Sequence, residues 1–199
     1  MDEIRLTFLQ KDEIDEAAGV LAVAMLDNPL HVAVFQGDAQ TRRGAIETMF
    51  SGLLRCLPEI VFVAKEADRI VGVMRMKSCE GFKPAPGPDR QGDENEPDWR
   101  KQVWHAEWAR REPPNQHWHL GPIGVLPSHQ GRGVGSMLMH RFCAETDACT
   151  AEAYLETDLD RNVRFYEKFG FKLTAESDIL GVPNRYMLRP AHGGGKGQR

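Results

Sequence analysis

The sequence lacks any long apolar run, and this absence excludes one class of protein. No stretch of about 18 apolar residues occurs, which is the length that a membrane-spanning helix needs. The opening segment, MDEIRLTFLQ, begins with acidic residues and has no apolar signal core. We therefore expect a cytoplasmic protein with no membrane partner.

An excess of positive charge is also missing. The formal net charge is −4, whereas a nucleic-acid-binding domain normally presents a basic face. We therefore expect no nucleic-acid partner.

Cysteine is scarce and scattered along the chain. The four cysteines form no Cys-x-x-Cys pair; they are Cys56, Cys79, Cys143 and Cys149. This spacing fits buried thiols in a reducing compartment better than a disulfide framework or a zinc site. The cysteine pattern therefore predicts no metal.

What the chain does contain is typical of one globular domain. It has 199 residues, of which 41% are hydrophobic, enough for a single domain with a full core. Predicted elements follow the order β-α-α-β-β-insert-β-α-β-α-β-β, in which the insert ends with a helix. This order predicts one α/β domain with a mixed sheet over residues 1–190 and a flexible tail over residues 191–199.

The N-terminal half supplies two predicted helices and a hairpin. Apolar periodicity predicts helices over about residues 11–26 and 41–57, and Asn28-Pro29 is expected to end the first of them. Two strands around a polar turn predict a β-hairpin over residues 60–77.

An insert over residues 81–116 interrupts this order and is a candidate lid. Its first half is rich in proline, glycine and acidic residues, and its second half carries Trp99, Trp104 and Trp108 with a helical rhythm. Acids and aromatic rings together suit a cationic amine, through charge attraction and cation–π contact. The other interpretation is a solvated loop followed by a helix that packs its tryptophans on the core.

A glycine-rich loop, SHQGRGVGS over residues 128–136, follows a predicted strand and opens a predicted helix. It matches neither the ATP/GTP loop, which needs a lysine after a suitably spaced glycine, nor the dinucleotide loop, which needs a glycine where Ser136 stands. A helix N-terminus offers unpaired N–H groups and partial positive charge. The loop therefore favours a pyrophosphate, although an ordinary turn is the alternative. Its candidate contributors are three glycines and a basic residue, namely Gly131, Gly133, Gly135 and Arg132.

Two motifs resemble the signatures of one family. Gln130, Gly133 and Gly135 are similar to the Gln/Arg-x-x-Gly-x-Gly/Ala acyl-CoA signature of the GNAT N-acetyltransferase superfamily. Asn162 and Tyr166, with the Gly-Phe pair that follows them, match its second signature at the family's spacing. Two motifs in the right order are more specific than either alone. The segment from about Trp118 to Arg189 resembles the puromycin N-acetyltransferase-like branch.

The resemblance implies a single-domain α/β GNAT fold, with a mixed central sheet splayed at its fourth and fifth strands and flanked by helices. It implies acetyl-CoA as co-substrate and direct acetyl transfer to a primary amine in a ternary complex. The pantetheine arm is expected along the strand where Gly121-Pro122 interrupts pairing, with the Val125 N–H on the thioester carbonyl. The expected cofactor-binding residues are Ile123, Gly124, Val125, Gln130, Gly131, Arg132, Gly133, Val134, Gly135, Ser136 and Asn162.

Candidate catalytic residues follow from the resemblance and from proton chemistry. Tyr166 matches the family's general acid, which protonates the departing thiolate, although a core tyrosine is the alternative. For the general base, His119 lies on the splayed strand and Glu156 ends the next strand. The ordinary pKa of histidine suits a base near neutrality, but a water chain, a surface histidine and a solvated glutamate stay open. A metal site at His117-x-His119 would need a third ligand, and the sequence shows none.

The acceptor and the assembly are less constrained. We expect a small-molecule amine acceptor and a monomer or homodimer, while an antibiotic, a polyamine and a protein N-terminus all fit the same chemistry. One alternative function is a non-catalytic acyl-CoA-binding or sensing module, which would have no need of Tyr166. Another is a nucleotide-binding protein, which both failed loop comparisons disfavour.

Overall fold

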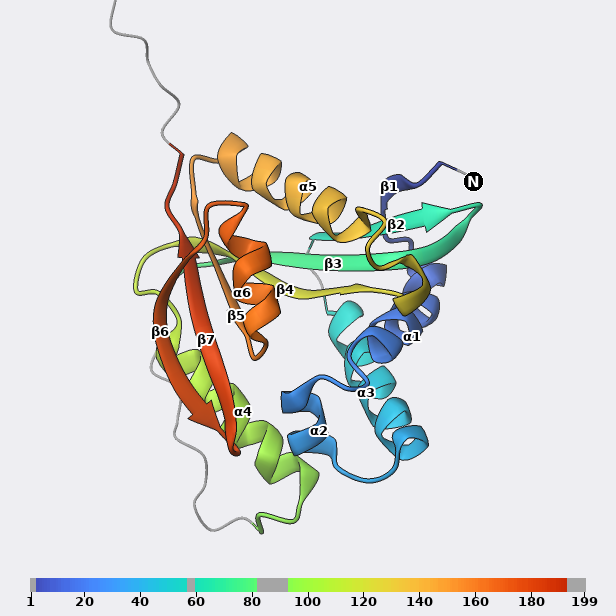
Figure 1. Cartoon of the computed structure of the whole chain (residues 1–199), viewed down its shortest axis with the longest axis vertical. Coiled ribbons are helices and arrows are strands. Elements are labelled where there is room, and N and C mark those ends of the chain that lie inside the picture. The colour runs from blue at the N-terminus through green and yellow to red at the C-terminus, as the bar shows by residue number, and fades with distance from the viewer. Residues whose placement is uncertain (1–2, 57–59, 82–92, 193–199) are drawn as a thin grey trace, which may run out of the picture.

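A mixed seven-stranded sheet organises the residues that the computed structural model describes, 3–56, 60–81 and 93–192 (Figure 1). The strands lie in the order β1-β2-β3-β4-β5-β7-β6. Neighbouring strands are antiparallel except β4 and β5, which run parallel. Their bounds are β1 (Arg5–Phe8), β2 (Ile60–Glu66), β3 (Arg69–Cys79), β4 (His117–Val125), β5 (Glu152–Thr157), β6 (Lys172–Ile179) and β7 (Val182–Arg189).

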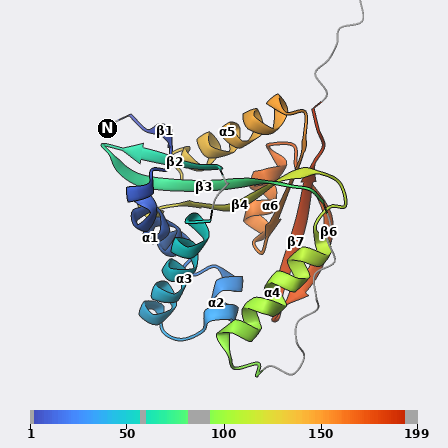
Figure 2. The same cartoon turned by 180° about the vertical axis from the view of Figure 1, so that it is seen from behind.

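Helices cover both faces of this sheet (Figures 1 and 2). One buried cluster joins α1, α2, α3 and Trp104 of α4 to one face, and a second joins α5 and Tyr166 of α6 to the other. The predicted α/β class with a mixed sheet is therefore confirmed. The helix bounds are α1 (Ile14–Ala24), α2 (Pro29–Phe35), α3 (Ala39–Leu54), α4 (Pro97–Arg111), α5 (Val134–Ala148) and α6 (Asp160–Glu167), with 3₁₀ turns at Lys11–Glu13 and Pro127–His129.

One of these helices, α2, is missing from the sequence prediction. Asn28 caps it, because its side-chain oxygen accepts a hydrogen bond of 3.1 Å from the backbone N–H of His31. Pro29 fits the first turn, where an N–H would have no helical partner. The Asn28-Pro29 pair that was expected to end a helix therefore begins a second one.

The predicted hairpin and the second predicted helix are present with shifted limits. The hairpin is formed by β2 and β3, which extends to Cys79 and turns at Ala67 and Asp68, both with positive φ. Helix α3 begins after Asp38, whose side chain accepts from the N–H of Thr41 at 2.8 Å. It ends at Leu54, three residues short of the predicted limit.

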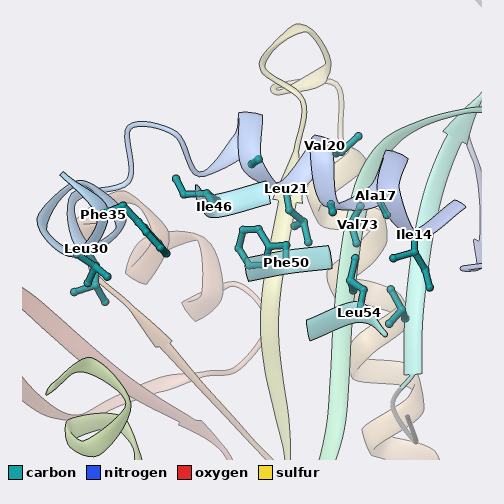
Figure 3. Packing of buried hydrophobic residues seen from close by; sticks show 14 of the residues in the cluster. Ile14, Ala17, Val20, Leu21, Leu30, Phe35, Ile46, Phe50, Leu54 and Val73 are labelled. Atoms are coloured by element: carbon teal, nitrogen blue, oxygen red, sulfur yellow. The ribbon is translucent and has the colours of Figure 1, made fainter. Parts of the chain in front are cut away.

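Helix α1 packs closely on the end of β4. A Cβ added at Gly124 would lie 3.0 Å from both the Ala24 Cβ and the Leu21 Cδ2, so a glycine is needed for this approach. Figure 3 shows Leu21 among the buried side chains of this layer, with Phe50 and Val73 nearby. This contact holds β4 against the helices on one face.

The predicted splay between the fourth and fifth strands is confirmed. β4 pairs with β5 only from His117 to His119. On its other edge β4 stays paired with β3 as far as Val125, with a register shift at Gly121-Pro122. Beyond His119, no described strand pairs with the β5-facing edge of β4, and this unpaired edge is called the slot below.

Two expected segments lie partly outside the described residues, namely 82–92 of the insert and 193–199 of the tail. Among the described residues, no single helix combines the length and apolar content needed to cross a membrane. The segments Lys11–Ala24 and Pro29–Phe35 reach the required length and apolar content only when taken together, and a bend of 104° separates them.

The layer around α2 encloses a buried histidine. The His31 ring packs against the rings of Phe35, Phe50 and Trp104. Its Nδ1 lies 2.8 Å from the side-chain oxygen of Asn28, whereas its Nε2 has no hydrogen-bond partner among the described residues. Burial lowers the pKa of His31 to about 4, so the folded state keeps the ring neutral.

Folding stability should therefore fall in mild acid. An unfolded histidine has a pKa of about 6.5, so between this value and about 4 only the unfolded state takes up the proton. The free energy of unfolding should drop by about 3 kcal/mol over this range, at about 1.4 kcal/mol per pKa unit. Denaturant titrations at about pH 7 and pH 4 measure the drop, which should be smaller in His31→Gln.

The His31→Gln comparison isolates one ring. The neighbouring carboxylate of Asp158, which accepts from Asn28 and from the Leu30 N–H, is present in both proteins. An equal acid-induced loss in wild type and variant would show that His31 does not carry the effect.

Candidate functional site

The free edge of β4 presents backbone groups to the slot. The N–H of Leu126 donates to the Val71 carbonyl of β3 at 2.9 Å. Successive residues of a strand direct their N–H and C=O groups to opposite edges, so the N–H of Val125 points toward the slot. The Val125 carbonyl lies on the same edge and accepts from Gln130 Nε2 at 3.1 Å.

The same alternation determines to which edge of β4 the other expected residues direct their backbone groups. Ile123 directs its N–H and C=O toward the slot, as Val125 does, whereas Gly124 directs them toward β3. Gly124 instead contributes its missing side chain, which lets α1 approach. The slot therefore offers alternate amides, a pattern suited to an extended chain that carries amide groups of its own.

The glycine loop continues from the end of this strand and opens toward unoccupied space. Gly131 and Gly133 have φ of 74° and 86°, values that favour glycine. A Cβ added at either position would meet nothing within 4 Å. No described side chain caps α5, so the N–H groups of Val134, Gly135 and Ser136 converge there without helical acceptors. The arrangement suits an anion.

Two loop residues are also part of the interior. The Val134 side chain is buried in the cluster between α5 and the sheet. A Cβ at Gly135 would lie 3.6 Å from the Phe165 ring and 4.0 Å from a Val125 methyl. Both positions can therefore offer an anion only their backbone.

Arg132 does not act as an isolated cation at the rim of the loop. Its guanidinium donates to Glu66 at 2.5 Å, and His129 Nε2 lies 2.9 Å from the other oxygen of that carboxylate. The hydrogen bonds from Arg132, and then from His129, hold the pKa of Glu66 below its ordinary value. The positive charge expected from Arg132 is thus partly neutralised by the Glu66 carboxylate. The partial positive charge of the helix N-terminus is the other attraction for an anion at this loop.

Tyr166 lies on α6 with its ring packed against Phe165 and Phe171. Burial, and secondarily the negative charge of Asp158, raises the pKa of this phenol above its ordinary value. The hydroxyl is therefore protonated at neutral pH, as a proton donor must be.

Asn162 is placed one turn before Tyr166 on the same helix. Its side-chain amide donates to the Thr157 hydroxyl at 3.1 Å, and this hydroxyl also accepts from the Leu159 N–H at 3.4 Å. The bond ties the first turn of α6 to the end of β5. Asn162 thus positions the helix that carries Tyr166, and its expected contact with the cofactor stays a prediction.

His119 and Glu156, the two candidate bases, form a direct pair across the slot. Nε2 of His119 lies 2.7 Å from Oε2 of Glu156, and both side chains are largely buried. Burial alone would lower the pKa of His119, but Glu156 and the Cys79 thiol raise it to about 9. The ordinary histidine pKa used in the sequence argument therefore does not apply, and the two groups form one unit.

His117, on the same face as His119, lies beside two groups that the sequence did not connect with it. Cys79 is its cross-strand partner on β3, and Glu112 follows the last residue of α4. The ligand atoms of Cys79, Glu112 and His117 lie within 4.8 Å of one another. This group includes His117 but not His119, so the expectation that no third ligand completes a His117-x-His119 site stays a prediction.

The helical half of the insert is anchored to the domain. Arg100 of α4 donates from Nε to the Val34 carbonyl of α2 at 2.6 Å, and Trp108 Nε1 donates to the Asn184 side chain of β7 at 3.4 Å. Trp104 is buried against the core. These contacts favour the interpretation in which the tryptophans pack on the core, while the acidic residues that begin the described part are exposed, namely Asp93, Glu94, Glu96 and Asp98.

This helix covers the face that carries the histidine–carboxylate pair. Glu156 stands opposite Tyr186 in the β5–β7 ladder, so the two side chains share one face of the sheet. The Arg111 guanidinium of α4 lies 5.8 Å from the centre of the Tyr186 ring. The end of α4 therefore borders the pair on the side away from α5.

Several residues of this site could not be predicted from local sequence patterns. Cys79, Glu112, Glu66 and Asp158 carry no motif, and each takes its place from pairing between distant segments. One sequence pattern could have located Cys79. Extending the second strand of the predicted hairpin to Cys79, and pairing it in register with the next strand, would have placed Cys79 near the start of β4.

Comparisons with known proteins agree with this geometry. A model of the acetyltransferase (GNAT) family matches residues 39–171. A solved structure titled histone acetyltransferase HPA2 and related acetyltransferase, from Corynebacterium glutamicum, is 19% identical, with 98% of this chain and 99% of that chain covered and a TM-score of 0.71. Salmonella typhimurium yncA, solved with its cofactor acetyl-CoA, is 17% identical, with 98% of each chain covered and a TM-score of 0.57.

A third solved structure is that of an agmatine N-acetyltransferase. It is 15% identical, with 94% of this chain and 99% of that chain covered and a TM-score of 0.66. At these identities the three structures show a shared fold.

A side chain added at Gly133 should weaken the binding of acetyl-CoA. Asparagine tolerates a positive φ better than most residues, so Gly133→Asn should fold while its side chain fills the space before α5. Calorimetric titration should show affinity reduced by about tenfold or more, or at least about 1.4 kcal/mol.

Gly181→Asn is the matched control. Gly181 has φ of 78° and open space around it, but it lies in the turn between β6 and β7. If both variants bind acetyl-CoA as wild type does, the glycine loop is not the pyrophosphate site.

Proposed function

Since this chain belongs to the acetyltransferase (GNAT) family, and is thus an acetyl-CoA-dependent acyltransferase, we propose that it acetylates a primary amine of a small molecule. The acetyl group passes directly from acetyl-CoA to the amine in a ternary complex. The observation that carries the proposal is the free edge of β4. It runs from the N-terminus of α5 to the His119–Glu156 pair.

Acetyl-CoA binding is assigned mainly to backbone groups. The pyrophosphate lies against the N–H groups at the start of α5, and the pantetheine arm lies along the slot at Ile123 and Val125. Gln130 supports the loop through its bond to the Val125 carbonyl. The remaining assigned residues shape the loop or add charge, namely Gly124, Gly131, Arg132, Gly133, Val134, Gly135, Ser136 and Asn162.

The chemistry needs a neutral amine, a stabilised carbonyl oxygen and a proton for the leaving thiolate. The amine nitrogen bonds to the acetyl carbon, and the Val125 N–H, which faces the slot, stabilises the charge that develops on the carbonyl oxygen. The carbon–sulfur bond then breaks, and Tyr166 protonates the thiolate of coenzyme A. The proton released by the amine passes to the Glu156 carboxylate of the His119–Glu156 unit, directly or through water, because a pKa of about 9 keeps the His119 imidazole protonated at neutral pH.

The acceptor is proposed to enter from the face bordered by α4. Glu156 lies on that face, and the exposed carboxylates at the start of α4 attract a cationic amine to this side of the molecule, although the last turn of the helix, beside Glu156, carries Arg110 and Arg111. The agmatine N-acetyltransferase that shares the fold has such an amine in its name. Kinship with the puromycin branch, the cytoplasmic location, and a monomer or homodimer stay predictions.

Tyr166→Phe separates the proposed enzyme from a protein that only binds or senses acyl-CoA. On an acceptor found by mass-spectrometric screening of amines, turnover should fall by about 10²–10⁴-fold, the usual effect of losing a general acid. The dissociation constant of acetyl-CoA should stay within about threefold of wild type, because binding is assigned mainly to backbone groups and a tenfold change would need about 1.4 kcal/mol.

Phe165→Leu is a packing control on the same helix, since Phe165 contacts the Tyr166 ring but has no titratable group. Wild-type turnover in Tyr166→Phe would make this tyrosine structural. Absence of acetyl transfer to every amine, with acetyl-CoA still bound, would favour the sensing module.

A further inference from the structure

Three chain segments meet at one end of the sheet and bring together a thiol, an imidazole and a carboxylate. Cys79 ends β3, His117 begins β4, and Glu112 lies in the connection from α4 to β4. Their ligand atoms lie within 4.8 Å of one another, and His117 and Cys79 are buried. None of the three is needed for the proposed acetyl transfer.

The imidazole of His117 is already oriented as a ligand. Its Nδ1 lies 2.9 Å from the Asn115 carbonyl, so this nitrogen carries the hydrogen and donates it. Its Nε2 is fully buried and has no hydrogen-bond partner among the described residues. Metal-binding histidines generally donate their second N–H to such an acceptor, which directs the free lone pair at the ion.

The spacing also suits a small tetrahedral ion. Nε2 of His117 lies 3.5 Å from Oε1 of Glu112. Two ligands placed about 2.0–2.1 Å from a tetrahedral zinc ion lie about 3.4 Å apart. A thiolate and a carboxylate also balance the two positive charges of the ion, although Lys77 and His119 lie next to the cluster as further charged groups.

We propose that Cys79, Glu112 and His117 bind a zinc ion, with water as the fourth ligand. One sulfur, one nitrogen and one oxygen donor within 4.8 Å of one another match the donor preferences of zinc. The Glu112 side chain is 24% exposed, which provides the path by which the ion enters.

The ion would connect the insert to the sheet. Glu112 comes from the end of α4, whereas the other two ligands come from paired strands. Zinc would thus fix the end of α4 beside the face that carries Glu156. The site adjoins the catalytic unit, because Cys79 interacts with His119, but the ion takes no part in the proposed acetyl transfer, so either assignment can fail without the other.

A hydrogen-bonded cluster without a metal is the competing explanation, and cobalt distinguishes the two. Full-length protein, stripped with a chelator, is titrated with Co²⁺ and followed by absorption. A bound thiolate should give a near-ultraviolet charge-transfer band and tetrahedral visible bands that saturate at one ion per chain. Added Zn²⁺ should remove both sets of bands.

Variants then assign the ligands. Cys79→Ser should abolish the charge-transfer band, and Glu112→Gln, at a partly exposed position, should weaken Zn²⁺ binding. Loss of an outer partner costs about 10–100-fold in metal affinity, and loss of a ligand should cost at least as much. Cys149→Ser, at an exposed cysteine outside the cluster, is the control and should bind as wild type does.

The proposal is overturned by either of two results. One is the failure of wild-type protein to bind stoichiometric Co²⁺ or Zn²⁺, a result that requires no variant to fold. Alternatively, the charge-transfer band could persist in Cys79→Ser and vanish in Cys149→Ser, which would place the metal at another thiol.

Discussion

The separation of β4 from β5 is the constraint on which the rest of the site depends. A strand inside a sheet normally satisfies its N–H and C=O groups on both edges, and a buried group left without a partner costs free energy. β4 meets this demand on the β3 side along most of its length but on the β5 side only at its start. Its remaining edge is therefore prepared for a ligand that brings amide groups of its own.

Packing on the two faces keeps this edge in place. On one face α1 approaches so closely that Gly124 has no room for a side chain. On the other face Val134 and Gly135 of α5 rest on the sheet and on α6. The strand and the start of α5 are thus held as one unit, so the slot leads directly into the glycine loop.

A second set of contacts joins the segments across the slot. Asp158, just after β5, accepts from the Leu30 N–H and from the Asn28 side chain at the start of α2. Its charge also contributes to the raised pKa of Tyr166. The capping residues of α2 therefore take part in placing the end of β5, next to Glu156 and the proposed general acid.

Features encoded by neighbouring residues could be predicted from the sequence, whereas features that depend on contacts between distant segments could not. The order of the apolar patterns is local and led to the α/β class. The glycine loop and the Asn162–Tyr166 spacing are also local, and the resemblance that they carry, with the interruption at Gly121-Pro122, implied the splayed sheet. α2 was missed because an asparagine–proline pair can both end one helix and cap the next. The group around His117 could not be predicted, because it depends on strand register and on the path of the insert.

Hydrogen–deuterium exchange with and without acetyl-CoA tests the central claim most directly, since it reads the backbone groups to which binding is assigned. The amides of Ile123, Val125 and residues 134–136 should exchange more slowly when acetyl-CoA is bound, while those of the β6–β7 hairpin stay unchanged. Unaltered exchange along β4 and the start of α5 at saturating acetyl-CoA, or protection confined to another surface, would contradict the account.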